Sequence, residues 1–160
     1  MAISKELFLA LLSMDAYNRG YGSGIADGVN LDPDGNDLDG LGGPGSRIGS
    51  ALVTRDDISE VAQAAGFYAI AYTLTEAVGE GPDALASGTT VISYRGTDTS
   101  IDYLKGWLIG AGVTAPITQA DETMAFYHAV AGTLGPDANL IVTGHSLGGG
   151  LACRPAGAFA

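Results

Sequence analysis

Apolar residues along this chain follow helical spacing in some segments and form short continuous runs in others. Spacings of three and four residues predict amphipathic helices at 4–14, 54–65 and 121–134. Short runs rich in Ala, Ile, Val, Thr and Tyr predict strands at 67–74, 89–94 and 139–143. The last run is apolar in its middle without alternation, which is typical of a buried parallel strand. The pattern therefore predicts an α/β fold, with a mostly parallel twisted sheet and flanking helices.

The first predicted helix has Ser4 as its expected N-cap. Its predicted apolar face consists of Leu7, Ala10, Leu11 and Met14. Acidic residues flank this apolar run and no small-x-small cleavage site follows, so we expect the helix to belong to the fold. If the protein is secreted, we expect it to lack a cleavable N-terminal signal.

The other two predicted helices have their own boundary signals. Thr54 is the expected N-cap of the second and Gly66 its stop, with an apolar face of Ile58, Val61, Ala62 and Ala65. The third ends at Gly135-Pro136, and its predicted apolar stripe is Met124, Tyr127, Ala131 and Leu134.

Composition narrows the class of protein. The chain has 160 residues, which suits a single domain over residues 1–160. Its formal net charge of −11 repels phosphate backbones and anionic lipid headgroups, so no nucleic-acid partner is expected. No apolar run approaches the roughly 20 residues of a membrane span. Cys153 is the single cysteine, which excludes an intrachain disulfide, and it is expected to be a small, partly buried apolar residue.

An acidic segment is the one candidate for metal binding. Carboxylates and an amide gather at Asp32, Asp34, Asn36, Asp37 and Asp39, and the start resembles an EF-hand loop. The sixth position of such a loop requires Gly but holds Asp37, and its twelfth position is Gly43 where Glu is needed. We expect a solvated acidic loop that binds calcium weakly or not at all, and no other cofactor.

The candidate chemistry lies in the run Gly144-His145-Ser146-Leu147-Gly148, between the strand 139–143 and a following helix. In a Gly-x-Ser-x-Gly turn the serine occupies a strained bend with its Oγ presented above the sheet. The two glycines stand where a Cβ would collide with the neighbouring strand or helix. The Leu147 amide is then the first oxyanion donor, at the positive end of the helix.

Together with Tyr94-Arg95-Gly96-Thr97 about fifty residues earlier, this run resembles the class 3 (fungal-type) lipase family of α/β-hydrolases. The run Met14–Tyr21 also looks like that of bacterial members. The resemblance implies that Ser146 is the nucleophile and that Thr97 supplies the second oxyanion donor through its amide and hydroxyl. It implies hydrolysis of lipid or other acyl esters through a serine acyl-enzyme.

The rest of the catalytic triad has no clear candidate. In the α/β-hydrolase order the acid and the histidine follow the nucleophile, but no His, Asp or Glu follows Ser146. His145 is expected to point away, into packing between strand and helix, and His128 lies upstream on the helix 121–134. Pro155 is expected to end the helix that follows the elbow.

These departures predict an incomplete α/β-hydrolase fold, from a truncated or frame-shifted reading of a longer gene. Such a chain would lack turnover by itself, and its strand 139–143 would lack a neighbour, so self-association through an unpaired sheet edge is possible. The segment Asp98–Pro116, with Trp107, Leu108 and Ile109, is a candidate lid or an ordinary core helix. The alternative function is that of a non-catalytic hydrolase-like fragment, a binding or calcium-dependent interaction module.

Overall fold

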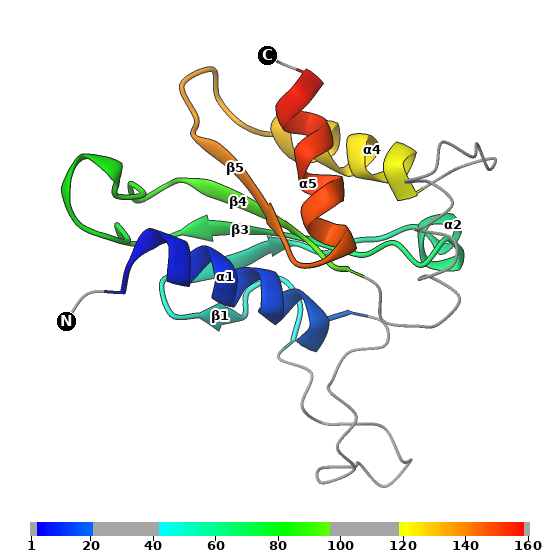
Figure 1. Cartoon of the computed structure of the whole chain (residues 1–160), viewed down its shortest axis with the longest axis horizontal. Coiled ribbons are helices and arrows are strands. Elements are labelled where there is room, and N and C mark those ends of the chain that lie inside the picture. Colours follow the sequence, from blue (N-terminus) through cyan, green and yellow to red (C-terminus); the bar gives the residue numbers. More distant parts are fainter. Residues whose placement is uncertain (1–2, 21–41, 97–118, 159–160) are drawn as a thin grey trace, which may run out of the picture.

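The computed structural model describes residues 3–20, 42–96 and 119–158 (Figure 1). A five-stranded sheet with the order β1-β2-β3-β4-β5 forms the centre of this part of the chain. The strands are β1 (Arg47–Ile48), β2 (Ala51–Arg55), β3 (Ala69–Leu74), β4 (Thr90–Tyr94) and β5 (Leu140–Gly144). The helices are α1 (Lys5–Asp15), α2 (Glu60–Ala64), α4 (Gln119–Ala131) and α5 (Leu147–Ala158), with short 3-10 turns η1 (Ala16–Asn18) and η2 (Gly81–Asp83). Sheet and flanking helices confirm an α/β architecture.

The prediction of a mostly parallel sheet is wrong for the described strands. The pairs β1–β2, β2–β3 and β3–β4 are antiparallel, and only β4–β5 is parallel. A parallel pair needs a long crossover, usually through a helix, and the segment between β4 and β5 provides one in α4. The first four strands instead follow one another across the sheet and reverse direction at each step.

Side chains from the two faces of the sheet form two separate hydrophobic cores. Alternate residues of β3 point to opposite faces, so Ile70 and Tyr72 enter one core whereas Ala69 and Ala71 enter the other. The first core includes Phe8 and Leu12 from α1. The second receives side chains from α2, α4 and α5: Ala62, Phe126, Val130, Leu151 and Ala152. Helices therefore cover both faces of the sheet, as predicted.

A buried ion pair follows the end of α1. Arg19 Nε lies 2.5 Å from Asp15 Oδ2, and both side chains are 0% exposed. The Tyr72 hydroxyl from β3 donates to the same carboxylate at 2.7 Å. Burial, together with the Asp15 charge, raises the pKa of Tyr72 far above its ordinary value, so the hydroxyl stays protonated as a donor. Arg19 also donates to the carbonyl of Gly42 and the hydroxyl of Ser46, both at 2.6 Å.

The first helix is confirmed, but its predicted apolar face is wrong. The Leu7 amide donates to Ser4 Oγ at 3.3 Å, which confirms the N-cap. Leu7, Leu11 and Met14 are 55%, 43% and 45% exposed, whereas Phe8 and Leu12 are buried. Both faces of this helix carry apolar residues, so spacing alone did not identify the buried one.

The second predicted helix begins later than expected. Residues 51–55 form strand β2, with Ala51 and Val53 buried, and the N-cap is Ser59 rather than Thr54. Ser59 Oγ accepts from the Ala62 amide at 3.0 Å. Gly66, with a φ of 74°, ends the helix as predicted.

Helices α4 and α5 also depart from the expected pattern in detail. The predicted stripe on α4 is only partly buried, and the buried face consists of Gln119, Ala120, Thr123, Phe126 and Val130. In α5 the helix continues past Pro155 to Ala158, although proline removes one amide donor. Leu151 and Ala152, one turn earlier, are buried and hold this part of the helix on the sheet.

Two absences can be stated for the described part of the chain. None of its helices combines the length and the hydropathy that crossing a bilayer requires. Within the same residues, no three His, Cys, Asp or Glu side chains are grouped so that they could hold a metal ion. The acidic segment Asp32–Asp39 lies outside the described residues.

The two ion pairs of the described residues predict very different effects on stability. Asp15→Asn removes one charge of a fully buried pair and leaves Arg19 uncompensated, so the free energy of unfolding should fall by about 3–5 kcal/mol. Asp57→Asn breaks the pair with Arg55, in which the Asp57 side chain is 71% exposed, and should cost no more than about 1 kcal/mol. Urea unfolding followed by circular dichroism measures both. Equal effects would contradict the structural role of the buried pair.

Candidate active site

Ser146 occupies the sharp bend predicted for it. It lies between the last residue of β5, Gly144, and the first residue of α5, Leu147. Its φ is 56°, and it is the one non-glycine residue with a positive φ in the described part of the chain. Such a conformation costs on the order of 1–3 kcal/mol for a residue with a side chain, so it persists only where the surroundings impose it. The Ser146 side chain is exposed.

The glycines on either side explain how the bend is kept. A Cβ on Gly144 would overlap the carbonyl group of Gly148, and a Cβ on Gly148 would overlap the carbonyl of Tyr94. Strand β5, helix α5 and the end of β4 therefore approach one another more closely than any side chain allows. The prediction that both positions require glycine is confirmed.

The first amides of α5 are not equally available. The amides of Gly148 and Gly149 donate to the carbonyls of His145 and Ser146, each at 3.0 Å. The Leu147 amide has no backbone acceptor within the described residues. Amides at a helix N-terminus favour negative charge, so this free donor beside Ser146 suits a developing oxyanion.

The end of β4 lies directly beside the elbow. In the parallel ladder Tyr94 is opposite Gly144, so the residues that follow these two leave the sheet at the same edge. An ideal Cβ on Gly96 would lie 3.1 Å from Ser146 Cβ and would overlap the carbonyl oxygen of His145. Gly96 therefore leaves no room for a side chain beside the elbow, and Thr97, the next residue, lies outside the described residues.

Tyr17 joins these two segments. Its hydroxyl accepts a hydrogen bond from the Gly96 amide at 3.0 Å and lies 3.2 Å from His145 Nδ1. The rings of Tyr17 and His145 meet edge to face, with centroids 5.9 Å apart. We assigned no role to Tyr17 from the sequence, although it stands in the run Met14–Tyr21 that carried part of the lipase resemblance.

The two histidines of the sequence do not contact the serine hydroxyl in the described residues. His145 is exposed and contacts Tyr17, so the prediction that it packs between strand and helix is wrong. Its ring lies against η1 because α1 and its extension run beside β5. His128 is exposed on α4, with its ring against Tyr127. Cys153 is exposed on α5 rather than partly buried as predicted.

A charged side chain packs on an aromatic ring where β4 ends and β3 begins. The Arg95 guanidinium lies 4.8 Å from the centroid of the Tyr68 ring, and both residues are buried. Burial, followed by the charge of Asp56, raises the pKa of Tyr68 above its ordinary value. Gly20, with a φ of 71°, passes so close to this ring that a Cβ would overlap it. The segment after η1 is thereby packed onto Tyr68, the residue before β3.

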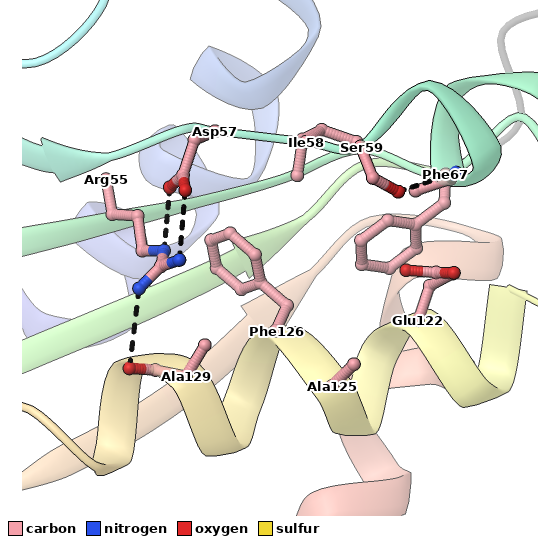
Figure 2. A pocket seen from close by; sticks show the side chains of 10 residues that line it. Arg55, Asp57, Ile58, Ser59, Phe67, Glu122, Ala125, Phe126 and Ala129 are labelled. Carbon is pink, nitrogen blue, oxygen red and sulfur yellow. Dashed lines mark hydrogen bonds and ion pairs between the residues drawn. The ribbon is translucent and has the colours of Figure 1, made fainter.

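A separate hollow of about 450 Å³ lies between α2 and α4 (Figure 2). Arg55 borders it and is already paired with Asp57 and with the Ala129 carbonyl. Its other lining residues are mainly apolar: Ile58, Ser59, Ala62, Phe67, Glu122, Ala125 and Phe126. This hollow does not include the elbow. The candidate lid Asp98–Pro116 lies outside the described residues.

Comparison with known families gives one clear result. The sequence model of the Mbeg1-like family matches residues 51–159. The chain belongs to the Mbeg1-like family. No curated protein and no solved structure shows a significant match. In this Mbeg1-like chain the matched region contains β2 to α5, and with them Gly96 and Ser146, whereas Tyr17 precedes it.

Two glycines of α5 in this Mbeg1-like chain provide a matched pair for testing the elbow. Gly148→Ala places a methyl group against the Tyr94 carbonyl, and such overpacking should lower the free energy of unfolding by about 1–3 kcal/mol or more. Gly150→Ala meets no atom within 4 Å and should raise it by about 0.5–1 kcal/mol, because alanine favours a helix. Urea unfolding of both variants measures the difference. A neutral Gly148→Ala would contradict the close approach of α5 and β4.

Proposed function

We propose that this protein is a carboxylic ester hydrolase that acts through an acyl-enzyme on Ser146. The observation that carries the proposal is the backbone of Ser146, a serine kept in a left-handed conformation at a strand-to-helix turn. Strained non-glycine residues concentrate at functional sites, and this turn is the one that exposes a nucleophile above a sheet. Resemblance to class 3 lipases favours lipid or other acyl esters as substrates.

The proposed reaction has two steps. Ser146 Oγ attacks the ester carbonyl carbon and gives up its proton to a base, and the tetrahedral intermediate collapses with release of the alcohol. Water then hydrolyses the acyl-serine and regenerates the hydroxyl. In the described residues neither a histidine nor a carboxylate is hydrogen-bonded to Ser146, so serine reactivity is a more direct test than turnover.

The oxyanion of the intermediate requires donors aimed at one point. The Leu147 amide is free within the described residues and belongs to the first residue of α5. We assign the second donor to Thr97, because Gly96 already contacts the elbow. Two preorganised donors of this kind supply a large part of the rate enhancement in acyl transfer.

The first test of this function is labelling by a fluorophosphonate, which forms a bond between phosphorus and an activated serine oxygen with loss of fluoride. We expect mass spectrometry to locate the adduct on Ser146, and Ser146→Ala to abolish it. In a protein extended with the missing acid and histidine, hydrolysis of p-nitrophenyl butyrate should fall by several orders of magnitude in Ser146→Ala, as in enzymes that lose a nucleophilic serine.

Ser59→Ala is the matched control, because Ser59 is the N-cap of α2, lies far from the elbow in the sequence and has no part in the proposed reaction. It should be labelled like the parent protein. Absence of an adduct on Ser146 in the parent protein, with the fold intact by circular dichroism, would remove the esterase assignment. That result would favour a non-catalytic binding module.

The second test concerns the oxyanion donors. Thr97→Val keeps the shape of the side chain and removes its hydroxyl, so the rate of Ser146 labelling should fall roughly 10- to 1000-fold. Thr133→Val removes a hydroxyl that donates to the Val130 carbonyl at the end of α4 and should leave the rate unchanged. An unaltered rate in Thr97→Val would place the second donor elsewhere.

A further inference from the structure

One tyrosine hydroxyl contacts both segments that form the candidate site. The Gly96 amide donates to the Tyr17 hydroxyl at 3.0 Å, and His145 Nδ1 lies 3.2 Å from the same oxygen. Gly96 immediately precedes Thr97, and His145 immediately precedes Ser146. The oxygen therefore touches the residue before the proposed second oxyanion donor and the residue before the proposed nucleophile.

The Gly96 amide needs this partner because the sheet no longer provides one. The last ladder bond at this end of β4 runs from the Arg95 amide to the Tyr68 carbonyl at 3.0 Å. One residue later the amide points to Tyr17 instead of to a neighbouring strand. The orientation of the Arg95–Gly96 peptide, at the end of β4, thus depends on a side chain from outside the sheet.

Tyr17 itself is held rigidly. It lies in η1 between Asp15 and Arg19, the two residues of the fully buried ion pair. Tyr72 holds the carboxylate of that pair and Ser46 holds its guanidinium. Buried, ion-paired residues on both sides leave the tyrosine little freedom to shift along its turn.

We propose that Tyr17 is a positioning residue, whose hydroxyl holds the end of β4 at Gly96 against the elbow that carries Ser146 and the Leu147 amide. The inference rests on the esterase function proposed above. Catalytic groups must keep their geometry to a fraction of an ångström, and a displacement of about 1 Å can lower a rate roughly 100-fold. A single oxygen that contacts both segments fixes the position of Gly96 relative to His145.

The test is Tyr17→Phe, which removes the hydroxyl but keeps the ring that packs on His145. Hydrogen exchange of the Gly96 amide, measured by nuclear magnetic resonance, should accelerate about five- to tenfold, the scale of one lost hydrogen bond. The labelling rate of Ser146 by a fluorophosphonate should fall roughly 10- to 100-fold. The loss should appear in the labelling rate at saturating fluorophosphonate, with the concentration for half-maximal rate little changed.

Thr54→Val is the matched control. The Thr54 hydroxyl donates to the Ala71 carbonyl at 3.2 Å, away from the elbow, so this variant also loses one partly buried side-chain hydroxyl bond. Exchange at Gly96 and labelling of Ser146 should match those of the parent protein. Equal losses in both variants would mean a general loss of stability and would overturn the positioning role.

The remaining outcomes separate the inference from the proposed function. Unchanged exchange at Gly96, or faster exchange with an unchanged labelling rate, overturns the role of Tyr17 while the esterase assignment stands. A parent protein that is not labelled at Ser146 overturns the esterase assignment, and the positioning role with it, even where exchange at Gly96 confirms the contact.

Discussion

The parallel pairing of β4 with β5 is the constraint on which the candidate site depends. Because the two strands run in the same direction and Tyr94 is opposite Gly144, both leave the sheet at one edge. The strand pairing alone therefore brings Gly96 close to Ser146 at this edge. The antiparallel strands on the other side of β4 broaden the sheet and its two cores, and β3 begins at this same edge, where Ala69 is opposite Tyr94.

The N-terminal segment adds a second constraint from one face of the sheet. Helix α1 packs on β4 and β5, and the Ser93 hydroxyl donates to the Leu12 carbonyl at 3.0 Å. The turn that follows α1 is fixed by the buried pair of Asp15 and Arg19 and ends with Tyr17 against the elbow. Burying charged groups is costly, and here the buried pair lies on either side of the residue that contacts the elbow.

The sequence was most informative where structure is local. The strand, the bend and the two glycines around Ser146 lie within a few residues of one another, and each was predicted. The direction of strand pairing was not predicted, because the spacing of apolar residues does not indicate which strands pair or whether they run antiparallel. Strand β2 was mistaken for the start of a helix. Tyr17 reaches Gly96 and His145 across 79 and 128 positions, so nothing in the pattern of apolar residues indicated those contacts. The buried face of α1 was missed because both of its sides are apolar.

The left-handed backbone of Ser146 also determines which residues at this position favour the folded state. Glycine adopts this conformation without penalty, so a Ser146→Gly change would relieve strain and favour the folded state. Under the proposed function, folding stability favours glycine at this position whereas the acyl-enzyme mechanism requires serine, a conflict typical of reactive centres. Chemistry, and not folding, would then determine the residue at position 146.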